Sequence, residues 1–143
     1  ISGEGSLCDT IIKLLKEMKI EDCTTWINEF GKWEEIQEIY NKAHGLLCMQ
    51  EYGGWGLIVP EAMASGLLVA GSSGVDSVDT YIVDGYNGLY CNRKDYNTIL
   101  SSIIEIVSDK DRFEQVRYNA RETIKYGDVK YYAKRMASFI QKH

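Results

Sequence analysis

Three glycines and one glutamate stand out as residues that could bind a ligand. Gly53, Gly54 and Gly56 precede an apolar run, "LIVPEAMAS", whose single charged residue is Glu61. Burying an unpaired carboxylate is costly, so a glutamate inside an apolar run calls for a partner. Glycine has no side chain and lets the backbone approach another molecule closely. The pattern predicts a ligand with an anionic middle and a hydroxyl-rich end.

The start of the expected helix at residues 57–65 could form an anion site from backbone alone. First-turn N–H groups have no partner within a helix, and Pro60 lies in that turn, where a missing N–H is tolerated. Together with the helix dipole, this predicts three free N–H groups, those of Leu57, Ile58 and Val59. Glu61 follows one turn later and could accept two hydroxyl hydrogen bonds, as from a ribose diol. The alternative is a tight strand-to-helix turn with Glu61 exposed to solvent, and the residues alone leave both open.

The elements that would position these residues follow from the apolar pattern. Helical spacing is found in the segments 6–19, 32–43, 57–65, 95–107, 110–124 and 129–140. Short apolar runs predict strands at 24–27, 45–49, 67–70 and the end of 83–91. Continuous apolar strands separated by helices predict an α/β fold, a Rossmann-like parallel sheet with helices on both faces. Because ligands bind where such strands end, the loop 71–74, "GSSG", should lie beside the glycine loop.

Length and composition describe one globular domain. The 143 residues are 45% apolar and 26% charged, as in ordinary soluble proteins, and no apolar run approaches the ~18 residues of a membrane span. We expect a single domain over residues 1–143, ending in C-terminal helices at about 94–142. "GEGSLC" nearly matches a dinucleotide-binding fingerprint, but a tight strand-to-helix turn is the favoured interpretation.

The cysteines and the charge distribution bear on location and partners. No C-x-x-C pair or zinc spacing occurs, so we expect no metal site, and buried free thiols of a cytoplasmic protein are favoured for the four cysteines, Cys8, Cys23, Cys48 and Cys91. Residues 109–143 hold nine Lys/Arg and five Asp/Glu, a charge of +4, although the whole chain carries −5. This basic tail predicts either a solvated helix face or peripheral contact with an acidic partner or an anionic membrane.

The motif order resembles a known family. "GWGLIVPEAMASGLLVAGSSG" followed by "VDGYNGLYC" is similar to the C-terminal, donor-binding domain of GT-B-fold glycosyltransferases of family 4, the glycosyl transferases group 1. The resemblance covers nearly the whole chain and implies a nucleotide-diphosphate sugar as substrate, with no cofactor. In that family the second glutamate of an E-x7-E motif holds the nucleotide ribose, which implies Glu61 here. Backbone of the glycine loop and helix start holds the diphosphate and sugar, which implies Gly53, Gly54, Trp55, Gly56, Leu57 and Ile58.

Several positions depart from the family pattern. The first motif glutamate, which faces the transferred sugar, falls at Gly53, and the nearest carboxylate is Glu51, which we expect to take its catalytic place. The family's "GG-x-x-E" loop corresponds to "SSGVDSVD", with Asp76 or Asp79 in place of the glutamate. No Lys or Arg occurs from Ala43 to Asn92, so the family's basic pair on the diphosphate would precede residue 1. The domain's first strand and helix, and the acceptor-binding N-terminal domain, would also lie outside the chain.

These observations predict the donor-binding part of a hexosyltransferase, by resemblance of the retaining type. The intact protein would transfer a sugar to a polysaccharide or a lipid-linked glycan, and the isolated chain would be inactive. The alternative is a non-catalytic nucleotide- or sugar-binding or scaffold domain with a degenerate E-x7-E motif. No nucleic-acid partner is expected.

Overall fold

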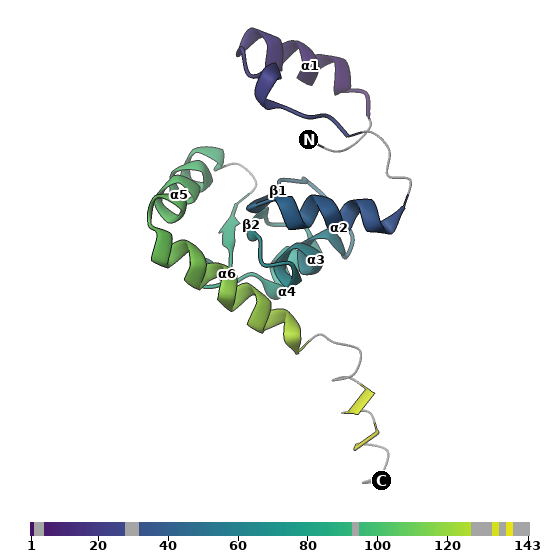
Figure 1. The fold of residues 1–143 in the computed structure, drawn as a ribbon, viewed down its shortest axis with the longest axis vertical. Coiled ribbons are helices and arrows are strands. Elements are labelled where there is room, and N and C mark those ends of the chain that lie inside the picture. The colour runs from purple at the N-terminus through teal and green to yellow at the C-terminus, as the bar shows by residue number, and fades with distance from the viewer. Residues whose placement is uncertain (2–4, 28–31, 93–94, 127–132, 135–136, 139–143) are drawn as a thin grey trace. The chain divides into compact units, whose positions relative to one another are not determined.

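The computed structural model describes residues 1, 5–27, 32–92, 95–126, 133–134 and 137–138 (Figure 1). In chain order the elements are α1 (Cys8–Glu17), the 3-10 helix η1 (Glu21–Cys23), α2 (Trp33–Lys42), β1 (Gly45–Cys48), α3 (Ile58–Ala64), β2 (Leu68–Ser72), α4 (Asp76–Tyr81), β3 (Leu89–Cys91), α5 (Tyr96–Ser108) and α6 (Lys110–Lys125). The predicted helices at 6–19, 32–43, 57–65, 95–107 and 110–124 are confirmed. The predicted helix at 129–140 lies largely outside the described residues.

The chain divides into two compact units, Ile1–Ile39 and Tyr40–His143. Within the first unit, α1 is amphipathic but buries none of its residues. The predicted strand at 24–27 is not formed as such: the Ile27 N–H donates to the Ile1 carbonyl oxygen, and the Ile1 amino group donates to the Thr25 carbonyl oxygen, both at 2.9 Å.

The second unit is built on a three-stranded parallel sheet in the order β1-β2-β3. The register pairs Leu46 with Val69 and Ala70 with Leu89. Residues of β2 alternate between two apolar layers, because successive side chains of a strand point to opposite faces. Val69 packs in the layer that contains Val59 and Met63 of α3, whereas Leu68 and Ala70 pack in the layer that contains Ile99 and Ile106 of α5. Helices therefore cover both faces, and the predicted α/β, Rossmann-like class is confirmed.

Strand β1 differs from the buried strand that "GLLCM" predicts. Leu47 is 62% exposed and, of the residues Gly45–Cys48, only Cys48 is buried. In the part of the chain that the structure describes, β1 pairs with β2 alone. An apolar sequence makes burial of a strand possible, but how far the strand is exposed depends on how many strands and helices pack against it.

Helix α4 is an element that the sequence analysis missed. It occupies Asp76–Tyr81, a segment to which the sequence analysis assigned neither a helix nor a strand. Val78 of this helix and Val75 just before it are fully buried. Their helical spacing was present in the sequence, but the surrounding glycine, serine and aspartate residues made the segment resemble a loop. Asp79, considered as a counterpart of the family's glutamate, accepts a hydrogen bond from the Gly74 N–H at 3.2 Å and thereby stabilises the turn before α4.

The segment "DGYNG" forms a structural turn held against α6. Asn87 is 1% exposed, and its side chain accepts from the Val83 N–H at 2.7 Å. The same amide donates to the Tyr81 carbonyl oxygen and to the Thr123 hydroxyl, both at 2.9 Å. The resemblance in this segment therefore reflects the turn that leads into β3, at some distance along the chain from the glycine loop.

All four cysteines are free, as predicted. The prediction of burial holds for Cys48 and Cys91, while Cys8 is half-buried and Cys23 is exposed. Cys23 follows an apolar helix, but that helix buries no residue, so proximity to an apolar stretch did not imply burial. In the described parts of the chain, no helix combines the length and the hydropathy that crossing a bilayer requires.

Candidate functional site

The glycine loop between β1 and α3 is tied to the loop after β2, as the sequence predicted for neighbouring strand ends. The Ser72 hydroxyl donates to the Gln50 carbonyl oxygen at 2.8 Å, and the Gly53 N–H donates to the Gly74 carbonyl oxygen at 3.2 Å. A parallel bridge also joins Gly53 to Val75. Because the carboxyl ends of parallel strands lie at one edge of a sheet, these bonds place both loops where α/β proteins bind ligands.

The end of the glycine loop has little room for side chains. Gly56 has a φ of +61°, a backbone conformation that suits glycine, and its carbonyl oxygen accepts from the Ser77 hydroxyl at 3.0 Å. A Cβ at Gly56 would meet Ser77 Oγ and Val75 Cγ1 at 3.2 Å. At Gly54, in contrast, an added Cβ would meet no heavy atom within 4 Å. Gly56 is thus required by the loop itself, whereas Gly54 leaves open space beside the loop.

In the described part of the chain, the first turn of α3 leaves free two of the three N–H groups that the sequence predicted to be free. Glu61 N–H donates to the Leu57 carbonyl oxygen at 3.1 Å, which places Glu61 one turn after Leu57 as predicted. The Val59 N–H, predicted to be free, donates to the Gly56 carbonyl oxygen at 3.1 Å, so that prediction is wrong. Within the described residues, the N–H groups of Leu57 and Ile58 make no hydrogen bond. The tight turn at Gly56 uses one of the three amides to start the helix and leaves two.

Glu61 is neither unpartnered nor fully exposed. The side chain is half-buried, and its Oε2 accepts a hydrogen bond from the Tyr40 hydroxyl at 3.0 Å. Tyr40 comes from α2 and packs against the apolar layer beneath α3. The bond answers the question posed by a carboxylate in an apolar run, because a hydroxyl partner offsets the cost of partial burial.

Tyr40 is a site residue that the sequence analysis did not identify. Its position on the apolar face of α2 suggested only a packing role. Burial, the hydrogen bond to Glu61 and the negative charge of Glu61 all raise the pKa of Tyr40, with burial as the largest cause. The hydroxyl therefore stays protonated and acts as a donor to Glu61. The only signal in the sequence was a tyrosine rather than a leucine at an apolar position.

Two arginines of α6 contact the C-terminal end of α3, the opposite end from the glycine loop. Arg117 donates from Nε to the carbonyl oxygen of Gly66, and Arg121 donates to that of Ser65 at 3.5 Å. Both carbonyls follow the C-terminal end of α3, so these guanidinium groups complement the negative end of the helix dipole. No Lys or Arg occurs from Ala43 to Asn92, so the glycine loop and the start of α3 themselves offer backbone N–H groups as their positive groups.

The remaining predicted residues are placed but their roles stay predictions. Glu51 is exposed in the glycine loop, and Trp55 packs edge-on against Tyr81 with ring centroids 5.6 Å apart. Asp76 is exposed at the start of α4. Among the described residues, no group of three or more His, Cys, Asp or Glu side chains is placed to hold a metal ion.

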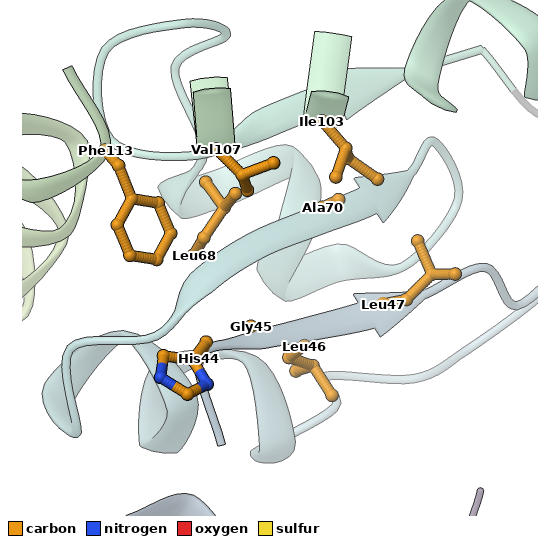
Figure 2. Close-up of a pocket in the computed structure, with 9 residues that line it drawn as sticks. All are labelled: His44, Gly45, Leu46, Leu47, Leu68, Ala70, Ile103, Val107 and Phe113. Atoms are coloured by element: carbon orange, nitrogen blue, oxygen red, sulfur yellow. The ribbon is translucent and has the colours of Figure 1, made fainter. Parts of the chain in front are cut away.

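A separate apolar cavity of about 240 Å³ lies between the sheet and α5 and α6 (Figure 2). Figure 2 shows Ile103, Val107 and Phe113 facing Leu68 and Ala70 across it. None of its lining residues belongs to the predicted donor site, and its walls carry few polar groups, so it is unsuited to a nucleotide-diphosphate sugar.

Comparison with known proteins agrees with this architecture. Residues 1–123 match the family described as glycosyl transferases group 1. The chain is 27% identical over 122 residues to N-acetyl-α-D-glucosaminyl L-malate synthase of Bacillus anthracis, covering 85% of this chain and 31% of that protein. The chain thus spans about a third of the length of this relative.

Solved structures share the fold. TarM of S. aureus superposes with a TM-score of 0.76 at 24% identity, covering 87% of this chain and 24% of that one. HepE of Anabaena, solved in complex with UDP-glucose, superposes with a TM-score of 0.79 at 13% identity, covering 99% of this chain and 40% of that one. The motifs, the parallel sheet and the family match over residues 1–123 lead to one conclusion: the chain belongs to the glycosyl transferases group 1 family.

Proposed function

We propose that this chain binds the nucleotide-diphosphate sugar donor of a glycosyltransferase. The observation that carries the proposal is the arrangement at the carboxyl ends of β1 and β2. There a glycine loop is anchored to the neighbouring loop and leads into α3, whose Glu61 is held by Tyr40. Family membership supports the same assignment.

Each part of the site would meet a different part of the donor. The carboxylate of Glu61 would accept hydrogen bonds from the ribose hydroxyls through lone pairs that Tyr40 does not use. Backbone N–H groups of Gly54, Trp55, Gly56, Leu57 and Ile58 would face the diphosphate and sugar. Glu51 would contact the hydroxyls of the transferred sugar. Gly54 would let the diphosphate approach the backbone, and Gly53 would face the transferred sugar.

The reaction would break the bond between the anomeric carbon and a diphosphate oxygen. A bond from that carbon to an acceptor oxygen forms, the acceptor hydroxyl loses its proton, and the nucleoside diphosphate leaves with the electron pair. Donors aimed at the departing phosphate favour this step because negative charge develops there. Backbone N–H groups and a helix dipole worth ~0.3–1 kcal/mol are weak partners for a diphosphate. We therefore propose that further cations come from parts of the enzyme outside these residues.

The nature of the whole enzyme is proposed from its relatives. One relative is named for N-acetyl-α-D-glucosaminyl transfer to malate, and one structure holds UDP-glucose. We propose a hexosyl donor and retention of configuration, with an acceptor that is a polysaccharide or lipid-linked glycan. A cytoplasmic enzyme in peripheral contact with a membrane through its basic C-terminal residues would fit such an acceptor.

A non-catalytic binding domain is the second candidate, and Gly53 favours it. The position where the family carries its sugar-facing glutamate has no side chain here. Such a domain would bind the nucleotide sugar without transferring it, even when joined to the remainder of the protein.

Titration calorimetry of the 143-residue chain tests the proposal. The wild-type chain is titrated with UDP, ADP and GDP, and with UDP-glucose, ADP-glucose and GDP-mannose. We expect saturable binding of one nucleotide and its sugar conjugate. A chain that binds none of the six would contradict both candidate functions.

A further inference from the structure

Gln50 is a polar residue at the ligand-binding edge of the sheet that no part of the assignment above uses. It follows β1 by two residues and is exposed. Its backbone is held in place because its carbonyl oxygen accepts from the hydroxyl of Ser72, which is 2% exposed. The side chain therefore starts from a fixed point at the carboxyl end of β1.

The side chain of Gln50 folds over the face of Gly53. Its Oε1 lies 2.7 Å from the position that a Cβ on Gly53 would occupy. Gly53 is also fixed, by its N–H bond to Gly74 and its bridge to Val75. The carboxamide thus occupies the space into which a side chain at position 53 would begin, and the absence of that side chain is what admits it.

The chemistry of a carboxamide suits this place. It offers one acceptor oxygen and two N–H donors, a combination that matches sugar hydroxyls, which both donate and accept. Being exposed, it can exchange water for a ligand hydroxyl without first breaking a buried interaction. At Gly54, the residue after Gly53, an added Cβ would meet no heavy atom within 4 Å, so there is open space next to the loop.

We propose that the Gln50 carboxamide is a contact for the hydroxyl groups of the donor sugar, filling the place that Gly53 leaves without a side chain. The inference rests on the proposed function and adds a residue to it. Gln50 acts on the sugar alone, whereas Glu61 acts on the nucleoside.

The test compares nucleotide with nucleotide sugar in the Gln50→Ala variant of the full chain. The probes are the nucleoside diphosphate and sugar conjugate that the wild-type chain binds, UDP and UDP-glucose being titrated first. We expect affinity for the sugar nucleotide to fall about three- to tenfold, as for loss of one or two neutral hydrogen bonds, with nucleotide affinity unchanged. The assignment would be overturned if Gln50→Ala bound both probes as tightly as the wild-type chain does. It would also be overturned if the variant lost affinity for both probes to the same extent.

Gly53→Ala is an independent variant in which residue 50 is still glutamine. The added Cβ must displace the Gln50 carboxamide, a flexible side-chain end, and needs only a small shift of Val75 Cγ2 at 3.3 Å. We expect the same selective loss as in Gln50→Ala, and no further loss in the double variant, because both changes remove one contact. Additive losses would show that Gly53 acts independently of Gln50 and would overturn the proposal.

Two controls separate this inference from the function on which it rests. Thermal unfolding of each variant checks that the loop change leaves the fold intact. Glu51→Ala tests whether the neighbouring carboxylate contacts the sugar instead. If Glu51→Ala lowered affinity for the nucleotide sugar alone and Gln50→Ala did not, the contact would belong to Glu51 and the assignment of Gln50 would be overturned. If the wild-type chain binds no nucleotide, the proposed function is contradicted, and so is the assignment of Gln50.

Discussion

The hydroxyl of Tyr40 donates a 3.0 Å hydrogen bond to Oε2 of Glu61, joining two residues that are 21 positions apart in the chain. Tyr40 lies near the end of α2, and Glu61 lies in the first turn of α3. The bond fixes one oxygen of the carboxylate and leaves lone pairs for a ligand. Glu61 is therefore a positioned carboxylate, which is what recognition of a diol requires.

Replacing Glu61 with glutamine should weaken nucleotide binding. The glutamine has nearly the same shape, and its carbonyl oxygen can still accept from Tyr40, so folding should be preserved. A hydrogen bond to a charged group contributes ~1.5–3 kcal/mol, so we expect about a tenfold or greater loss of affinity by calorimetry. Glu34→Gln, an exposed carboxylate of α2, is the matched control. Unchanged nucleotide affinity in Glu61→Gln would show that Glu61 does not bind the nucleotide and has only a structural role at the start of α3.

Tyr40→Phe should change how stability depends on pH. The pKa of Tyr40 is higher in the folded chain than its ordinary value of 10.0. The stabilisation linked to its proton is thus fully present below about pH 10, and it is lost as pH rises toward the folded-state pKa. The wild-type free energy of unfolding should fall more steeply above pH 10 than that of Tyr40→Phe, measured by urea unfolding. Parallel pH profiles would mean that Tyr40 and Glu61 are not coupled.

Gly54→Ala should impair binding without affecting stability. An added Cβ meets no heavy atom within 4 Å, so the urea midpoint should match that of the wild type. The methyl group would, however, occupy space proposed for the diphosphate and displace it from charge-assisted bonds, so donor affinity should fall about tenfold or more. Normal donor binding by a stable Gly54→Ala chain would place the diphosphate elsewhere.

Gly66→Ala should be destabilising, in contrast to Gly54→Ala. Gly66 ends α3 with a φ of +74°, and an added Cβ would lie 2.1 Å from Nε of Arg121. Left-handed backbone alone costs roughly 1–2 kcal/mol for a residue with a Cβ. Gly85→Ala is the control for that strain, because Gly85 has a φ of +70° and open space around it. Urea unfolding should show a larger loss for Gly66→Ala than for Gly85→Ala, and equal losses would assign no role to Arg121.

The four cysteines should differ in their reaction with iodoacetamide. Burial raises the pKa of the Cys48 thiol, and it also raises that of Cys91, where Asp95 and Asp84 add to the effect. Because the thiolate is the reactive form, both should be modified more slowly than exposed Cys23 in the folded chain, and equally fast in urea. Peptide mass spectrometry at pH 8 measures the rates. Rapid modification of Cys91 in the folded chain would contradict its burial.

The sequence by itself determined most of the helices, the parallel α/β class and the family. Local periodicity decides whether a segment such as Lys110–Lys125 is helical, because its apolar face repeats with the helical turn. The free N–H groups at the start of α3 could be foreseen for the same reason, since helix starts leave them unpaired. Val59 was the exception, because Leu57 already has helical backbone dihedrals (φ −55°, ψ −24°), which bring the Gly56 carbonyl oxygen within reach of the Val59 N–H.

Only the tertiary structure decided which distant residues meet. The partner of Glu61 and the exposure of Leu47 both depend on how separate elements pack. Helix α4 was missed because the burial of Val78, and of Val75 just before the helix, depends on packing against the sheet. Periodicity is a property of one segment, whereas a contact between segments is set by the packing of the whole unit.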